Sequence, residues 1–123
     1  MFEIRVVHSF PAGHFLRNYV GKCANPHGHN YRVEVAVSAP SLDDRGLLTD
    51  FAELKRRLRT ICERLDHQML NDIAPFDVRN PSAENIALYF YEELSAALPR
   101  ERGAAVSEVR VWETDTACAV FRP

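Results

Sequence analysis

The sequence predicts an α+β domain in which two helices cover one face of a four-stranded antiparallel sheet. Two segments near the N-terminus alternate apolar and polar residues, as strands do when one face is buried. Two later segments place apolar residues at three- and four-residue steps, which is the pattern of amphipathic helices. Two short β-prone runs close the chain, so the expected order is β-β-α-α-β-β over a single domain spanning residues 1–123.

Composition narrows the class of protein. Of the 123 residues, 46% are hydrophobic and 26% are charged, which is typical of a globular domain. The net charge of −2 argues against binding nucleic acid through a basic surface. No apolar run approaches the roughly 20 residues of a membrane span, and no basic leader precedes an apolar segment. We therefore expect a cytoplasmic protein with no membrane or nucleic-acid partner, and free thiols rather than disulfides for its three cysteines.

The two N-terminal strands are expected at residues 2–13 and 29–37. Alternate residues of each strand form an apolar face, and Pro40 with the polar run at 41–46 predicts a turn after the second. The apolar face of the first strand comprises Phe2, Ile4, Val6, His8, Phe10 and Ala12, and that of the second comprises Tyr31, Val33, Val35 and Val37.

Capping signals place the two helices. Asp50 and Glu53 have the spacing of a capping box, so the first helix is expected to begin near Asp50. The second should follow Pro81, with Ser82 as its N-cap. The apolar stripes are Phe51, Leu54, Leu58, Ile61 and Leu65 in the first helix, and Ile86, Phe90, Leu94 and Ala97 in the second.

The chain closes with two β-prone runs, 106–113 and 117–122, joined by a short polar turn. This pattern predicts a hairpin. Cys62 lies in the first predicted helix and Cys118 in the last strand, and we interpret both as packing residues.

Three histidines carry the main functional signal. His27 and His29 are two residues apart in a strand and so project to one face, while His14 ends the first strand. If these strands pair as a hairpin, the three imidazoles meet. Neutral imidazole is a natural zinc ligand, and three protein ligands leave the fourth position open, as in catalytic zinc sites. The alternative is a pair of structural strand histidines, and His8, which lacks a partner at ligand spacing, has a structural or supporting role.

Cys23 and the Asp66–His67 pair carry groups suited to proton transfer. Cys23 lies in a loop four residues before His27, where a nearby cation or metal would favour its thiolate. It can equally be a small loop residue, or a fourth zinc ligand that would make the site structural. Asp66 and His67 place a carboxylate beside an imidazole at a helix end, which suits acid–base catalysis but is also a common structural arrangement.

Glu113 is a carboxylate in an apolar run. It shares parity with Val109 and Val111, so its side chain is expected to face inward. An inward carboxylate needs a partner, and either the paired N–H donors of a ligand or an internal salt bridge would serve.

Six short motifs follow one another along nearly the whole chain. They are Phe10-Pro-Ala-Gly-His14, Cys23-Ala-Asn-Pro-His27-Gly-His29-Asn-Tyr31, Gly46-Leu-Leu-Thr-Asp50-Phe-Ala-Glu-Leu54, Leu65-Asp66-His67, Asn80-Pro-Ser-Ala-Glu84-Asn85 and Glu113-Thr114. Together and in this order they resemble the 6-pyruvoyltetrahydropterin synthase family. The short spacing from Cys23 to His27 and the run at 65–72 resemble its bacterial, 6-carboxytetrahydropterin-forming branch.

The resemblance implies a tunnelling fold, in which subunits join their sheets edge to edge into a barrel. Family members form trimers that stack into hexamers, so the resemblance also implies a homo-oligomer with active sites at subunit interfaces. The implied site residues are His14, His27 and His29 as ligands of Zn2+, Cys23, Asp66 and His67 as catalytic base and proton relay, and Glu113 with Ser82 as substrate-binding residues. The family more often reads Pro-Thr-Ser-Glu at 81–84, so Ala83 lacks a hydroxyl here while Ser82 keeps one.

The implied activity is zinc-dependent conversion of 7,8-dihydroneopterin triphosphate to 6-carboxy-5,6,7,8-tetrahydropterin, with release of acetaldehyde and triphosphate, in the deazapurine (queuosine) branch. Elimination of triphosphate to give 6-pyruvoyltetrahydropterin is the alternative reaction, because the two share every catalytic residue named above. A non-catalytic pterin- or zinc-binding member of the fold is a third interpretation. A mere binder would not need Cys23, Asp66 and His67 together.

Overall fold

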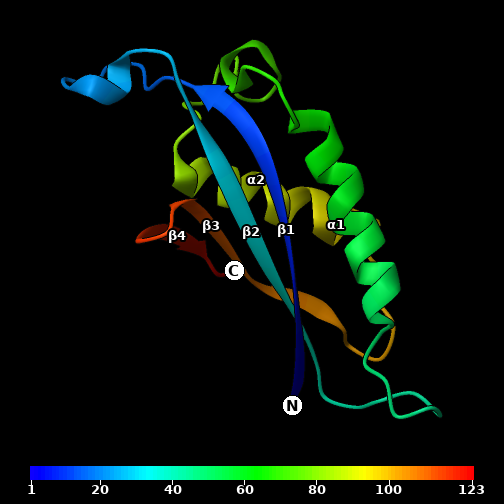
Figure 1. The fold of residues 1–123 in the computed structure, drawn as a ribbon. Coiled ribbons are helices and arrows are strands. Elements are labelled where there is room, and N and C mark those ends of the chain that lie inside the picture. The colour runs from blue at the N-terminus through cyan, green and yellow to red at the C-terminus, as the bar shows by residue number, and fades with distance from the viewer.

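A computed structural model describes all residues 1–123 and contains the expected elements in the expected order (Figure 1). The elements are β1 (Phe2–His14), η1 (Lys22–Ala24), β2 (His27–Ala39), α1 (Phe51–Leu65), η2 (Leu70–Asp72), α2 (Ala83–Ala97), β3 (Ala105–Thr114) and β4 (Ala117–Phe121). The strands form one antiparallel sheet in the order β1-β2-β3-β4. Neither α1 nor α2 has the length and apolar character that a membrane-spanning helix needs.

β1 and β2 form a long hairpin at one side of the sheet, with β1 as an edge strand. The two strands pair along their whole length, and the pairing ends with His14 opposite His27. β2 extends beyond the predicted range of 29–37 at both ends. The ladder with β1 continues through Gly28, a residue whose missing side chain gives no signal in an apolar–polar pattern.

The core lies between one face of the sheet and the two helices. α1 lies against β1, while α2 lies against β3 and β4 (Figure 1). Burial of these apolar side chains is the main driving force for this two-layer arrangement. The most deeply buried side chains include Phe10, Tyr31, Val33, Val35, Leu54, Leu58, Ile86, Phe90 and Leu94.

The start of α1 differs from the prediction in two details. The Asp50 side chain accepts a hydrogen bond from the Ala52 N–H at 2.8 Å, as an N-cap should. The predicted capping box is incomplete, because Glu53 pairs with arginines of the next turn instead of returning to the Asp50 N–H. The predicted stripe is also wrong at Phe51, which is 54% exposed, whereas Cys62 is 1% exposed and packs in the core.

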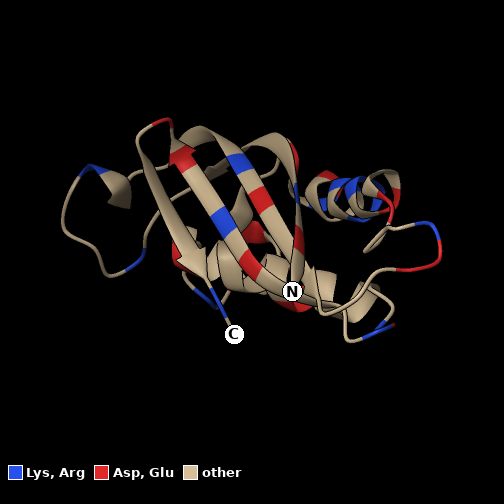
Figure 2. Ribbon diagram, turned by 90° about the horizontal axis from the view of Figure 1, so that it is seen from below, with Lys and Arg blue, Asp and Glu red and all other residues tan.

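The other face of the sheet has no helix against it and is charged (Figure 2). Glu108 lies at the centre of an ion-pair network with Arg5, Arg110 and Arg122, and its side chain is only 6% exposed. Cys118 is paired with Trp112 on this face and is exposed, so its prediction as a packing residue is wrong. The cause is its place on the uncovered side of an edge strand.

Candidate metal centre and active site

Strand pairing brings three histidines together at the end of the sheet. His14 lies opposite His27 in the β1–β2 ladder, and Ala12 lies opposite His29. The Nε2 atom of His14 is 3.0 Å from Nε2 of His27 and 3.1 Å from Nε2 of His29. One ligand nitrogen from each ring lies within 4.8 Å of the other two. The convergence expected from the sequence is therefore present.

The protonation pattern of this cluster fits a metal ion. Nδ1 of His14 lies 2.7 Å from the carbonyl oxygen of Pro81, and Nδ1 of His27 lies 2.7 Å from that of Asn25. A carbonyl oxygen only accepts hydrogen bonds, so these Nδ1 atoms carry the protons and each Nε2 presents a lone pair. Burial lowers the pKa of both His14 and His29, which favours the neutral rings that bind metals.

The spacing of the nitrogens is also close to that of a zinc site. Two nitrogens that each lie about 2.0–2.1 Å from a tetrahedral zinc ion are roughly 3.3–3.4 Å apart. The two separations from the His14 nitrogen are 3.0 and 3.1 Å. Lone pairs held this close repel one another unless a cation lies between them, so the cluster is chemically suited to Zn2+.

Glu113 lies beside the histidine cluster and faces inward, as predicted. Its Oε1 atom is 3.9 Å from Nε2 of His14, and neither a lysine nor an arginine pairs with it. The internal salt bridge with a basic residue is thus absent, and the carboxylate is available to a ligand. Glu113 lines a cavity of about 150 Å³ together with Ala83, Glu84, Ala117, Cys118 and Ala119.

Cys23 lies outside the cluster of converging ligand atoms. It is half-buried in η1, and its backbone oxygen accepts a hydrogen bond from the Leu16 N–H at 2.8 Å. The potential metal ligands that converge are the three histidines alone. This placement opposes the alternative in which Cys23 closes a structural zinc site.

Asp66 and His67 form a hydrogen-bonded pair just after α1. Nδ1 of His67 lies 3.0 Å from Oδ1 of Asp66, and the two side chains are 77% and 42% exposed. The His67 N–H donates to the Pro11 oxygen at 2.7 Å, and the Gly13 N–H donates to the Gln68 oxygen at 2.9 Å. Backbone hydrogen bonds therefore hold the segment that contains Asp66 and His67 against the outer edge of β1.

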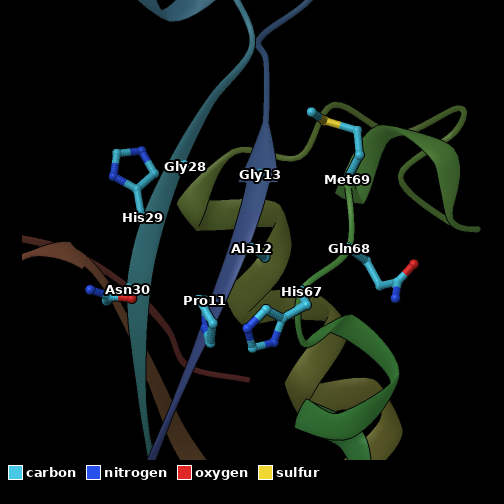
Figure 3. Close-up of a pocket in the computed structure, with 9 residues that line it drawn as sticks. All are labelled: Pro11, Ala12, Gly13, Gly28, His29, Asn30, His67, Gln68 and Met69. Carbon is cyan, nitrogen blue, oxygen red and sulfur yellow. The ribbon is translucent and has the colours of Figure 1, made fainter.

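A hollow of about 510 Å³ lies between this segment and β2. Gly13 and Gly28 face each other across the strands, and the Met69 side chain lies over Gly13, where an added Cβ would come within 3.1 Å of Met69 Cε. Figure 3 shows His67, Gln68 and Met69 on one side of the glycines, and His29 and Asn30 on the other. The hollow therefore joins the proposed relay residue His67 to the strand that carries His29.

A single chain does not bring all the predicted catalytic residues together. No hydrogen bond joins the Cys23 thiol to Asp66 or His67. Figures 1 and 2 both show the loop that carries η1 on the side of the sheet away from α1, whereas Asp66 and His67 follow the end of α1. Ser82 is the N-cap of α2, as predicted, and its Oγ accepts from the Asn85 N–H at 3.2 Å. Its contact with a substrate stays a prediction.

Sequence reasoning missed the groups that hold the site residues in place. The Pro81 carbonyl oxygen fixes the His14 ring, and the side chains of Asn71 and Asn80 bind the backbone that follows β1. Every residue has a backbone carbonyl, so the identity of residue 81 does not indicate that its carbonyl binds His14. Both asparagines are distant in sequence from the segment they bind, so no local pattern could have revealed them.

The fold and the site define a β-β-α-α-β-β protein with a histidine centre suited to a metal ion and a free carboxylate beside it. The model of one family, described as 6-pyruvoyl tetrahydropterin synthase, matches residues 3–123. The chain belongs to this family of tetrahydropterin synthases.

Individual relatives agree with this assignment. The chain is 34% identical over 128 residues to 6-carboxy-5,6,7,8-tetrahydropterin synthase of Bacillus subtilis, covering 99% of this chain and 86% of that protein. It is 36% identical over 107 residues to human 6-pyruvoyl tetrahydrobiopterin synthase, covering 83% and 71%. The structure of 6-pyruvoyl tetrahydropterin synthase from Caenorhabditis elegans superposes with a TM-score of 0.88 at 26% identity, covering 99% and 95%. The architecture is thus the tunnelling fold.

Proposed function

We propose that this protein is a zinc-dependent lyase that converts 7,8-dihydroneopterin triphosphate to 6-carboxy-5,6,7,8-tetrahydropterin, with release of acetaldehyde and triphosphate. The observation that carries the proposal is the convergence of the three histidine nitrogens, with the Glu113 carboxylate beside them and no lysine or arginine paired with it. The name of the Bacillus subtilis relative supports this product.

His14, His27 and His29 would hold the zinc ion. Bound zinc would supply Lewis-acid polarisation of the oxygen atoms on the substrate side chain. The Pro81 and Asn25 carbonyl oxygens hold the His14 and His27 rings so that Nε2 stays free to bind.

Glu113 would fix the pterin ring. An ionised carboxylate accepts hydrogen bonds only, so it matches adjacent N–H donors on the pterin. Because Glu113 lies beside His14, a ring held there extends its side chain toward the histidine cluster.

Proton transfer would involve Cys23 and the Asp66–His67 pair. The Cys23 thiolate is the proposed base that removes a proton from the substrate side chain. The Asp66 carboxylate accepts from Nδ1 of His67, which leaves Nε2 free to exchange a proton with substrate.

We further propose that a complete site needs two protomers. The edge strands of the sheet are β1, which the segment 67–69 covers only at residues 11–13, and β4, and edge strands with unpaired backbone groups favour pairing with another chain. Asp66 and His67 lie beside β1, whereas the cavity around Glu113 includes β4 residues. Pairing of β1 with β4 of the next copy would place His67 of one protomer near the Glu113 of its neighbour. Repetition of this contact would close a ring such as a trimer, and stacking of two rings would give the hexamer expected of the family.

Incubation of zinc-loaded protein with 7,8-dihydroneopterin triphosphate, with products read by mass spectrometry, tests the proposal. Acetaldehyde and 6-carboxytetrahydropterin are the expected products, and zinc-stripped protein is the control that should give neither. Formation of 6-pyruvoyltetrahydropterin would instead assign the reaction named for the human relative. Unchanged substrate with zinc fully bound would overturn both reactions and favour a binding protein.

A further inference from the structure

Two buried or half-buried asparagines bracket the chain segment that leaves the metal centre. Asn71 accepts a hydrogen bond from the Phe15 N–H at 3.0 Å and donates to the Phe15 oxygen at 3.0 Å. Asn80 accepts from the Arg17 N–H at 2.9 Å and donates to the Arg17 oxygen at 3.3 Å. Each side-chain amide therefore satisfies both backbone polar groups of one residue, as a neighbouring strand would.

Leu16 lies between Phe15 and Arg17, and its backbone N–H points to the opposite side of the chain. Along an extended chain, successive backbone N–H groups point to opposite sides. The N–H groups of Phe15 and Arg17 point to the asparagines, and the N–H of Leu16 donates to the Cys23 oxygen at 2.8 Å. The segment 15–17 thus connects the asparagines on one side to Cys23 on the other.

Both asparagines are anchored to the body of the domain. Asn71 lies in η2 and is 6% exposed, while the Asn80 oxygen accepts from the Asn85 side chain of α2 at 2.9 Å. The loop that carries Cys23 projects beyond the ends of β1 and β2 (Figure 1). The one other hydrogen bond from residues 15–24 to the domain body is a long one, from Nη2 of Arg17 to the Asn71 backbone oxygen at 3.4 Å, so the position of this segment depends mainly on the two amides.

We propose that Asn71 and Asn80 are positioning residues for Cys23, which they hold in place through the backbone of residues 15–17. The inference rests on the proposed role of Cys23 as the base. The histidines do not depend on this contact to the same degree, because the β1–β2 ladder positions them. Loss of the asparagine amides should therefore displace the thiol and leave the metal ligands in place.

The test compares Asn71→Ala and Asn80→Ala with wild type in the zinc-loaded protein. We expect zinc content to be retained, KM to change less than about threefold and kcat to fall about 10- to 100-fold, because a displacement of about 1 Å can cost 10²-fold in rate. Alkylation by iodoacetamide gives a readout that does not require turnover. The rate at Cys23, relative to exposed Cys118 in the same sample, should change at least about threefold, since exposure and surroundings control thiol reactivity.

Val106→Ala is the matched control, because it removes a buried side chain at the far end of the sheet from the histidines. A merely structural role predicts that the asparagine variants match this control in kcat and in the alkylation ratio, and this result would overturn the proposal. Loss of zinc along with kcat would overturn it too, because the amides would then support the metal centre. Asn71→Asp and Asn80→Asp, which keep one acceptor, replace any alanine variant that fails to fold. If wild type shows no turnover, the proposed function fails, and the alkylation ratio still decides the positioning.

Discussion

Nδ1 of His14 lies 2.7 Å from the carbonyl oxygen of Pro81, and this contact joins the end of β1 to the residue before the N-cap of α2. It orients the ring and puts the proton of the neutral imidazole on Nδ1, although the two residues are far apart in sequence. The same contact holds the start of α2, and with it Ala83 and Glu84, beside the cavity that Glu113 lines. The proposed metal binding and the proposed substrate placement would therefore both depend on this junction.

Replacement of a histidine of the cluster should abolish tight zinc binding. We expect His27→Ala and His29→Ala each to lower zinc affinity more than about 100-fold, the upper range for loss of a group that only supports a ligand. Zinc content after dialysis against a weak chelator measures this. His8→Ala is the control, because His8 lies on β1 outside the cluster, and it should keep wild-type zinc content. Equal retention by all three variants would exclude the histidines as ligands.

Cys23→Ala separates a catalytic zinc site from a structural one. Because the thiol lies outside the converging ligand atoms, the variant should fold, bind zinc as wild type does and lose activity. Circular dichroism, zinc content and turnover are the three measurements. A variant that unfolds and loses zinc would show instead that Cys23 is a fourth ligand.

Mixing two inactive variants tests whether a site is shared between protomers. Cys23→Ala and His67→Ala should each be inactive alone, since each lacks one proposed proton-transfer group. In hetero-oligomers formed by unfolding and refolding an equal mixture, about one quarter of shared sites receive both intact residues. Activity should recover to that extent. No recovery in verified hetero-oligomers would mean that both residues act within one chain.

The ion-pair network around Glu108 should make stability fall in acid. Burial alone would raise the pKa of Glu108, but hydrogen bonds from Arg5, Arg110 and Arg122 outweigh it and lower the pKa from 4.5 to about 2. Because the folded value lies below the unfolded one, the stabilisation is present above about pH 4.5 and is lost as the pH falls through 2.

Glu108→Gln measures this contribution. The pKa change corresponds to about 3 kcal/mol, and solvent screening of the exposed arginines reduces the expected loss of unfolding free energy at pH 7 to about 1–2 kcal/mol. The difference from wild type in urea denaturation should shrink between pH 4.5 and 2. Glu63→Gln is the control, since Glu63 is 68% exposed and lies 3.9 Å from its arginine. An equal loss in both variants would contradict the argument.

Two buried tyrosines should respond oppositely to loss of the hydroxyl. The Tyr31 hydroxyl is buried without a hydrogen-bond partner, whereas that of Tyr89 accepts from Arg64 at 2.7 Å. Tyr31→Phe should leave the free energy of unfolding unchanged or raise it by up to about 1 kcal/mol, while Tyr89→Phe should lower it by about 1 kcal/mol. Chemical denaturation measures both. A larger loss for Tyr31→Phe would reveal a partner for its hydroxyl in the assembled protein.

The sequence by itself determined the element order and most of the residues that face inward, with Phe51 and Cys118 as exceptions. Period-two alternation and helical stripes depend on which side chains avoid water, so Tyr31, Leu54 and Phe90 could be assigned to the core from the sequence alone. Parity along each strand also predicted that His14, His27, His29 and Glu113 share a face. These properties follow from local periodicity, which residue identity carries directly.

The tertiary structure decided the contacts between residues far apart in sequence, which local periodicity does not predict. The Pro81 carbonyl that orients His14 and the amides of Asn71 and Asn80 that bind residues 15–17 act across long sequence separations, through backbone groups common to all residues. It also separated Cys23 from the Asp66–His67 pair, because the end of α1 lies beside β1 whereas the Cys23 loop extends from the strand ends. Strand register and helix packing determine these distances, and they exist only once the sheet and both helices have come together.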